Sequence, residues 1–235
     1  METRHVTKLR DELDGHPANK RVKCLRYMFA WAVDAGHATR NPAKECALVR
    51  VASEGYATWT TSDVQVFEDR HEIGSKARLA LAMFLYTGAR KSDVVQLGPV
   101  NIRGDRLVFV QHKGREVKPK RRDIPLVAPL KAVLEVPPLG ATTFLETEYG
   151  KPFSINGFGS WFRKRCDEAG LTDLSAHGLR KAVGVMAAER GCTAHQIMEI
   201  LGHDTLEEAE RYTRTANART LGDAGFERLF GTEQE

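Results

Sequence analysis

The spacing of apolar residues predicts a mainly helical chain with one small antiparallel β-sheet near its middle. Apolar side chains recur at helical intervals over residues 22–35 and again over 79–86. Two β-branched runs, residues 107–110 and 123–126, flank Lys113-Gly114 and are typical of a hairpin. The expected fold class is therefore α+β, dominated by helices. Further helical patterns, most of which stop at a glycine, cover residues 91–97, 158–169, 178–190, 194–201 and 206 to about 218.

The same pattern predicts two units along the chain. Residues 1–50 form the first unit, and its last helix ends before Asn41-Pro42 because a residue that precedes proline is pushed out of the helical region. Residues 51–58 show no sustained period and indicate a linker. Residues 59–235 form the larger domain. We expect Ser62 to cap its first helix, with Gln65 completing a capping box.

The composition is that of an ordinary folded protein with a mild excess of positive charge. Of 235 residues, 42% are hydrophobic and 28% charged, and the formal net charge is +4. A packed core is expected, and this charge alone is a weak pointer to nucleic acid. The longest apolar stretch is far shorter than the roughly 20 residues of a membrane-spanning helix, and the N-terminus shows no secretory pattern. Four scattered cysteines, without a CxxC pair, favour reduced thiols in a cytoplasmic protein over a disulfide framework or a zinc site.

The segment 103–122 is strongly basic, with Asp105 and Glu116 as its acidic residues. A hairpin that lies along DNA would use such charge to neutralise phosphates. A solvated β-turn would show the same composition, because runs of charge are common on surfaces, so the pattern leaves both interpretations open. The basic residues are Arg103, Arg106, Lys113, Arg115, Lys118, Lys120, Arg121 and Arg122.

Two further segments carry side chains that suit phosphate chemistry. Arg90 follows Thr87-Gly88 at a corner between two predicted helices, with Asp93 three residues later. His177 and Arg180 are three residues apart at the start of a helix, so both project from one face. An imidazole beside a guanidinium makes a good cradle for a phosphate. Each pattern alone is more often structural than functional.

A third segment, Leu201-Gly202-His203, is followed by Arg211-Tyr212. A lone tyrosine is far more often a core or interface aromatic than a nucleophile. Together, however, two arginines, a lysine, two histidines and a tyrosine would supply the nucleophile, proton transfer and charge stabilisation of a metal-free phosphoryl transfer. A metal hydrolase built on His177, His195 and His203 would need a ligand spacing that the sequence lacks.

Taken in order, these segments resemble the boxes of the tyrosine recombinase, or phage integrase, family over about residues 58–222. The corner at Arg90 is similar to the family's first-arginine box, and Ala176–Arg180 to its HxxR box. Leu201-Gly202-His203, whose histidine lies nine residues before Tyr212, resembles the LGH box that precedes the nucleophile. The catalytic residues that the resemblance implies are Arg90, Lys113, His177, Arg180, His203 and Tyr212, with Asp93 in a supporting role.

The resemblance implies an enzyme that cuts and rejoins double-stranded DNA without metal, ATP or another cofactor. Tyr212 would form a 3′-phosphotyrosyl link and free a 5′-hydroxyl, while the two arginines stabilise the transition state. Lys113 would protonate the leaving oxygen, and Lys118 and Lys120, in the same unusually long hairpin segment, are alternatives for that role. His177 would help manage the tyrosine proton, and His203 would hydrogen-bond the phosphate.

The resemblance also implies a domain plan and partners. The expected fold is the tyrosine recombinase catalytic fold, preceded by a short partial core-binding segment in residues 1–50 that would be part of a clamp around DNA. Family members usually assemble as a tetramer on two DNA sites, often through exchange of the C-terminal segment, here Thr215–Glu235. An inactive DNA-binding remnant and a type IB topoisomerase are the alternative functions. DNA contacts are expected from Arg103, Arg106, Arg115, Lys118, Lys120, Arg121 and Arg122.

Overall fold

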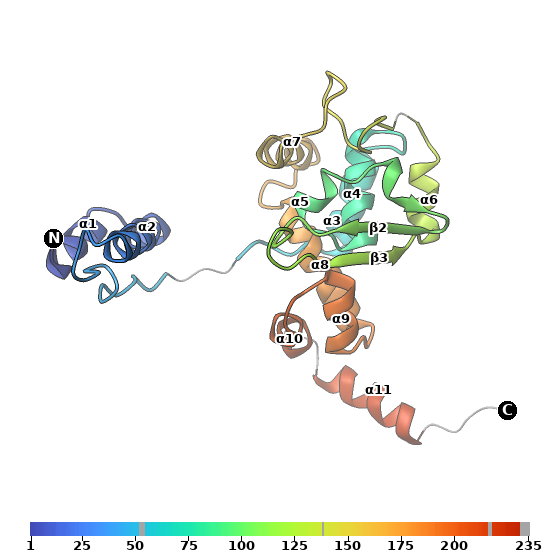
Figure 1. Cartoon of the computed structure of the whole chain (residues 1–235). Helices are drawn as coiled ribbons and strands as arrows, with labels where there is room; N and C mark the ends of the chain where they lie inside the picture. The colour runs from blue at the N-terminus through green and yellow to red at the C-terminus, as the bar shows by residue number, and fades with distance from the viewer. Residues whose placement is uncertain (52–54, 138, 216–217, 231–235) are drawn as a thin grey trace. The chain divides into compact units, whose positions relative to one another are not determined.

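The chain folds into two compact units, and the boundary between them along the sequence lies within the segment expected to be a linker. The computed structural model describes residues 1–51, 55–137, 139–215 and 218–230. The first unit is Met1–Gly55 and the second is Tyr56–Glu235. Helices dominate both units, and the second also holds a small antiparallel sheet (Figure 1). The expected fold class is confirmed.

Two helices, α1 (Thr3–Asp11) and α2 (Gly15–Asp34), form the first unit around a small apolar core. Val6 and Val22 are fully buried in it. Helix α2 begins earlier than the predicted range 22–35, and α1 was not predicted. Val6 and Leu9 are the apolar residues of this nine-residue helix, and two positions are too few to establish a helical period.

The second unit is built around α4 (Lys76–Thr87), which is buried on nearly every side. Its run from Leu79 to Phe84 lies wholly in the core, where α4 packs against α5, α6, α7 and α8. A helix that is apolar all round in this way must lie inside a domain. The surrounding helices are α3 (Thr61–Arg70), α5 (Lys91–Val94), α6 (Ala128–Leu134), α7 (Ile155–Glu168), α8 (Ala176–Glu189), α9 (Ala194–Leu201), α10 (Leu206–Thr215) and α11 (Ala218–Phe230), with a 3-10 turn at Pro99–Asn101.

Helix α3 begins with a capping box formed by Thr60 and Asp63. Thr60 Oγ1 accepts from the Asp63 amide at 3.1 Å, and the Asp63 carboxylate accepts from the Thr60 amide at 2.7 Å. The prediction that Ser62 and Gln65 form this box is therefore wrong. Gln65 instead donates to Asp69 at 2.7 Å along the exposed face of the helix. A carboxylate in the first turn also interacts favourably with the helix dipole, which favours the observed choice.

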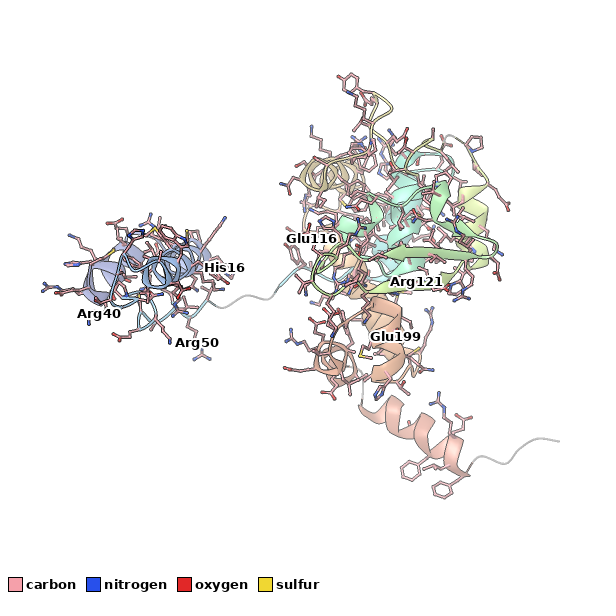
Figure 2. The ribbon with its side chains drawn as sticks, viewed as in Figure 1. His16, Arg40, Arg50, Glu116, Arg121 and Glu199 are labelled. Atoms are coloured by element: carbon pink, nitrogen blue, oxygen red, sulfur yellow. The ribbon has the colours of Figure 1, made fainter. Side chains whose placement is uncertain are left out.

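Three short antiparallel strands form the sheet, in the order β1 (Ile102–Arg103), β2 (Arg106–Val110) and β3 (Arg121–Pro125). Leu107 and Phe109 of β2 are buried, whereas their neighbours along the strand are half-buried or exposed. This alternation places every second residue of β2 in the core. The predicted hairpin is thus present. Its basic connection, residues 111–120, includes Glu116 and ends just before Arg121, both of which are labelled in Figure 2.

A second apolar cluster joins α8, α9 and α10. Ala188, Ile197, Leu201 and Ala209 are its most deeply buried members. The predicted helices 178–190 and 194–201 correspond to α8 and α9. The prediction for residues 206–218 covers α10 and reaches residues 216–217, which lie outside the described residues. Within the described ranges, every helix is too short or too polar to cross a membrane.

Candidate active site

Arg90 lies at the corner between α4 and α5. Helix α4 ends at Gly88, whose backbone is left-handed with a φ of 58°, and Arg90 is the N-cap residue of α5. A Cβ atom at Gly88 would lie 3.0 Å from the Ile200 carbonyl oxygen and 3.2 Å from Leu201 Cδ2. Glycine therefore suits both the turn and the close approach of the end of α9. The corner holds the half-buried Arg90 beside α9.

The first turn of α8 carries His177 and Arg180 on one face. Arg180 is 5% exposed, and its Nη1 donates to the carbonyl oxygen of Gly88. Burial, reinforced by the charge of Arg90, lowers the pKa of Arg180 to about 10, so the side chain remains a cation at neutral pH. Burial and the charges of Arg180 and Arg90 lower the pKa of His177. Its imidazole is therefore neutral near pH 7 and able to accept a proton.

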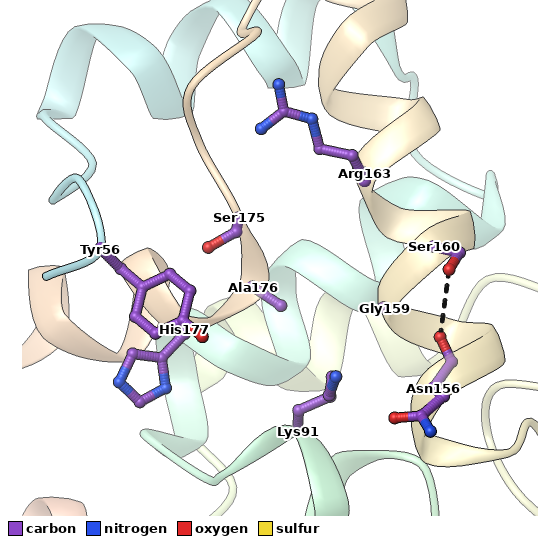
Figure 3. Close-up of a pocket in the computed structure, with 9 residues that line it drawn as sticks. All are labelled: Tyr56, Lys91, Asn156, Gly159, Ser160, Arg163, Ser175, Ala176 and His177. Atoms are coloured by element: carbon purple, nitrogen blue, oxygen red, sulfur yellow. Dashed lines mark hydrogen bonds between the residues drawn. The ribbon is translucent and has the colours of Figure 1, made fainter. Parts of the chain in front are cut away.

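A pocket of about 550 Å³ opens beside His177. The Tyr56 ring packs against the His177 ring, with 4.5 Å between centroids. Trp59 Nε1 donates to the Ser175 carbonyl oxygen at 2.9 Å, so the first residues of the second unit are held against the start of α8. Figure 3 shows Lys91 and the side chains around it on the walls of this pocket. The surroundings of His177 are thus polar, open and partly cationic.

His203 follows the left-handed Gly202 that ends α9. It is 6% exposed, and among the described residues its Nδ1 atom has no hydrogen-bond partner. Burial, followed by the charge of Arg180, lowers the pKa of His203 to about 4, so the ring is neutral at pH 7. A buried ring nitrogen without a partner is costly in a folded protein and suits a hydrogen bond to a group that enters the site.

Tyr212 projects from α10 toward this cluster. Its ring is nearly parallel to that of His203, with 6.0 Å between centroids and 13° between planes. Gly184 on α8 makes room for it, because a Cβ atom there would lie 2.5 Å from Tyr212 Cε1. Burial raises the pKa of Tyr212, although the nearby charge of Arg180 opposes the shift. The phenol therefore keeps its proton at neutral pH, within the electrostatic field of Arg180.

The lysines of the hairpin differ in where they lie. Lys113 is exposed on the connection between β2 and β3. Its neighbour His112 is tied to the site, since the His112 amide donates to Asp93 Oδ1 at 2.6 Å. Lys118 is also exposed, whereas Lys120 is half-buried and its Nζ donates to the His203 carbonyl oxygen. Of these lysines, the structure brings Lys120 into the cluster.

The basic residues expected to bind DNA do not all lie on the surface. Arg106 is exposed but forms an ion pair with Asp123 at 2.5 Å. Arg122 is only 3% exposed, so it does not lie on the exposed surface as the sequence interpretation required. Its Nη2 instead donates to the Ile200 carbonyl oxygen at 2.9 Å. Position 122 faces inward on β3, opposite the buried Phe109. The exposed members are Arg103, Arg106, Arg115, Lys118 and Arg121.

Gln111 is a buried polar residue of the site that was not recognised from the sequence, and Arg122, which was expected on the DNA-binding surface, is a second one. Gln111 is 2% exposed and hydrogen-bonds both Arg90 and the Gly202 carbonyl oxygen. Burial lowers the pKa of Arg122, and the charge of Arg90 adds to this shift, whereas the carboxylate of Glu199 opposes it. The signal that could have found Gln111 is its place in the inward-facing alternation after Leu107 and Phe109.

The cluster combines buried cations, neutral imidazoles and one phenol. Such an arrangement favours an anion with several acceptor oxygens, because fixed positive charge in a partly buried site acts strongly on it. Within the described part of the chain, no group of three or more His, Cys, Asp or Glu side chains could hold a metal ion. Arginines, histidines and a tyrosine in one cluster are residue types that a phosphoryl transfer would use.

Comparison with known proteins matches this chain to one family. The Phage integrase family matches residues 64–219, more than half of the chain. Tyrosine recombinase XerC of Bifidobacterium longum is 25% identical over 207 residues, which cover 78% of this chain and 57% of that protein. Tyrosine recombinase XerC of Mycobacterium bovis is 24% identical over 220 residues, covering 85% of this chain and 72% of that protein. The chain thus spans little more than half of the first relative's length.

Solved structures share the fold. A lambda integrase dimer bound to a COC′ core site superimposes with a TM-score of 0.76 at 19% identity, covering 91% of this chain and 80% of that one. The Tn1549 transposon integrase in complex with transposon right end DNA gives a TM-score of 0.72 at 14% identity, covering 97% and 85%. The family match and the fold identify this as the fold of a tyrosine recombinase catalytic domain. The chain belongs to the phage integrase family of tyrosine recombinases, as the resemblance indicated.

Proposed function

We propose that this chain is a site-specific DNA recombinase that cleaves and rejoins double-stranded DNA through a covalent bond to Tyr212. The observation that carries the proposal is the position of the Tyr212 ring, which lies beside that of His203 and against Gly184 of α8, one helical turn after Arg180. Arg90 and two neutral histidines lie in the same cluster. Together these groups offer a nucleophile, a charge clamp and proton carriers, which metal-free phosphoryl transfer requires.

In the cleavage step, the phenolic oxygen of Tyr212 attacks the scissile phosphorus. The bond from phosphorus to the 5′-oxygen breaks, leaving a 3′-phosphotyrosine and a 5′-hydroxyl. Arg90 and Arg180 hold the non-bridging oxygens and stabilise the charge of the pentavalent transition state. Attack by a 5′-hydroxyl from a second strand reverses the step and joins the strands. Because one phosphodiester replaces another, the cycle needs no ATP. Side chains of the chain itself carry every proposed step, without a metal or another cofactor.

The proton of Tyr212 needs an acceptor, since burial raises the pKa of the phenol. We assign this task to His177, which is neutral near pH 7 because its pKa is lowered. His203 donates a hydrogen bond to a phosphate oxygen. This bond would give the buried ring a partner, since its Nδ1 atom has none among the described residues. The two histidines thus serve proton transfer and binding respectively.

Protonation of the leaving 5′-oxygen is assigned to Lys113. Its position matches the family's hairpin lysine, and the Asp93 carboxylate ties the preceding residue to the site. A long exposed side chain anchored in this way can swing onto bound DNA. Lys120 is the rival, because its ammonium already donates to the His203 carbonyl oxygen. Lys118 is the third candidate.

The remaining proposals concern partners. We assign the first unit, with its exposed Arg40 and Arg50 (Figure 2), to the DNA clamp as a partial core-binding segment. The exposed hairpin arginines would contact phosphates. A lambda integrase structure is a tetramer bound to a Holliday junction, and we propose the same assembly here, linked through Thr215–Glu235. The enzyme would work in the cytoplasm on bacterial or phage DNA.

The test is covalent capture of DNA. Wild-type protein is incubated with a pool of nicked duplexes of randomised sequence, and adducts that resist detergent are collected and sequenced. We expect Tyr212→Phe to abolish adducts while DNA binding stays within about threefold. Tyr149→Phe, a change of the same kind at an 87% exposed position, should behave as wild type. Adducts from Tyr212→Phe would disprove the nucleophile, and none from wild type would favour an inactive remnant.

The lysine assignment has its own test on the captured sequence. When sulfur replaces the leaving 5′-oxygen, departure needs no general acid. We expect the cleavage defect of Lys113→Ala to disappear on this substrate. Rescue of Lys120→Ala or Lys118→Ala instead would move the role to that lysine. Relaxation of supercoiled plasmid without any preferred sequence would indicate a topoisomerase.

A further inference from the structure

We infer that Gln111 is a positioning residue for Arg90, a role that rests on the proposed function. Gln111 follows β2, and its amide N–H donates to the Lys120 carbonyl oxygen at 2.9 Å, which extends the β2–β3 pairing by one residue. Its side chain is 2% exposed. Leu107 and Phe109 occupy the preceding inward positions, so a polar amide stands where the pattern calls for an apolar side chain. A buried amide is retained at such a position when its hydrogen bonds matter.

Both ends of the Gln111 amide are occupied. Its Oε1 accepts from Arg90 Nη1 at 2.9 Å, and its Nε2 donates to the Gly202 carbonyl oxygen at 3.1 Å. The same oxygen accepts a longer bond of 3.4 Å from Arg90 Nη2. Arg90, Gln111 and Gly202 therefore form a closed ring of hydrogen bonds. This ring fixes the guanidinium relative to the turn that carries His203.

The turn is packed tightly against these side chains. A Cβ atom at Gly202 would lie 2.0 Å from Gln111 Nε2 and 2.0 Å from Arg122 Nη1. The φ of Gly202 is 62°, a left-handed conformation that glycine adopts without steric cost. The Gln111 amide and the Arg122 guanidinium therefore fill the space that a side chain at position 202 would occupy. This packing holds the Gln111 amide in place against the Gly202 carbonyl oxygen and Arg90.

The neutrality of Gln111 matters as much as its position. A carboxylate in its place would form an ion pair with Arg90 and reduce the positive field available to a phosphate. An apolar residue would leave the Arg90 guanidinium with one hydrogen bond fewer and more freedom to rotate. An amide holds the arginine and leaves its full charge for the substrate. The role is thus specific to glutamine rather than to any residue of its size.

The first experiment compares Gln111→Met with wild type in single-turnover cleavage of the captured sequence. We expect cleavage to fall roughly 10- to 100-fold, the effect of losing a hydrogen bond to a charged group. DNA affinity should change less than about threefold, because binding depends mainly on other phosphate contacts. Gln65→Met, which makes the same change on an exposed helical face, is the control. Unchanged cleavage by Gln111→Met would overturn the inference.

The second experiment replaces a non-bridging oxygen of the scissile phosphate by methyl, which makes the phosphate neutral. The demand for Arg90 then falls, so the defect of Gln111→Met relative to wild type should shrink on one stereoisomer. An equal defect on charged and neutral substrates would mean that Gln111 acts only in packing. If the methionine variant does not fold, Gln111→Glu can be used in its place. Its cleavage defect should be larger on the charged phosphate substrate than on the neutral methyl substrate.

A double-mutant cycle supplies the last check. On an Arg90→Ala background, Gln111→Met should cost little more cleavage, because the residue it positions is already absent. A full additional loss would show that the amide acts elsewhere. Failure of this inference is distinguishable from failure of the proposed function, because it requires a wild-type protein that forms the Tyr212 adduct.

Discussion

Replacing Gly184 by alanine should separate catalysis from stability. The added Cβ atom would lie 2.5 Å from Cε1, 2.6 Å from Cδ1 and 2.8 Å from Cζ of Tyr212. Carbon atoms prefer separations of roughly 3.5–4.0 Å, so the ring must move by about 1 Å. A misplacement of about 1 Å at a reacting group can reduce the rate on the order of 100-fold. Covalent capture should fall by that factor.

Stability should change little, because two effects oppose each other. Alanine favours a helix interior over glycine by about 1 kcal/mol. Crowding in a packed region costs about 1–3 kcal/mol. The free energy of unfolding should therefore drop by about 0–2 kcal/mol, measured by urea denaturation. The variant should remain folded and bind DNA.

Gly159→Ala on α7 is the matched control for Gly184→Ala. Its Cβ atom would meet only the end of the flexible Lys91 side chain, with Nζ at 2.8 Å, and that group can move aside. Cleavage should stay within about threefold of wild type, because long side chains relocate at little cost. Wild-type cleavage by Gly184→Ala, with the melting temperature unchanged, would refute the reasoning. The ring of Tyr212 would then not lie against α8 in the reacting state.

Two other predictions concern the buried His203 and the contrast between the exposed Arg121 and the buried Arg122. The free energy of unfolding should decrease as the pH falls from about 6.5 toward 4, because unfolded His203 binds a proton in this range and folded His203, with a pKa of about 4, does not. Urea denaturation from pH 4.5 to 7 should show the slope, and His203→Gln should reduce it. Arg121→Ala should weaken DNA binding and lower the salt slope by about 0.9, as expected for an exposed phosphate contact. Arg122→Ala should leave that slope unchanged and cost roughly 2 kcal/mol of stability, since a buried hydrogen bond is lost; equal salt slopes for both variants would contradict this.

Much of the fold could be predicted because apolar periodicity and glycine stops are local signals. Helices α8 and α9 follow directly from them, as does the β2–β3 hairpin. Helix α1 was not predicted, since two apolar residues in a nine-residue helix are too few to establish a period. The cap of α3 was assigned to the wrong pair because two capping boxes, two residues apart, fit the sequence. Local patterns do not decide between such close alternatives.

Some residues of the candidate site could likewise be predicted from the sequence, and others could not. The residues proposed for catalysis stand in recognisable boxes, and their roles stay predictions. Gln111 and Arg122 could not be placed from the sequence, because their importance arises from contacts with the end of α9, which is distant along the chain. In a basic segment, sequence alone does not distinguish an arginine that faces inward from one that faces water. Burial in three dimensions makes that distinction.

The alternation along β2 has a consequence for how this domain can vary in length. Inserting one residue between Arg106 and Val110 would reverse which side chains face the core and turn Gln111 outward. The connection that follows, residues 112–119, is exposed throughout and includes a left-handed Gly114. The part of the tip after Lys113 can therefore change in length while Gln111 keeps its hydrogen bond to Arg90. We expect such changes to alter the exposed basic surface of the tip while Lys113 keeps its distance along the chain from Gln111.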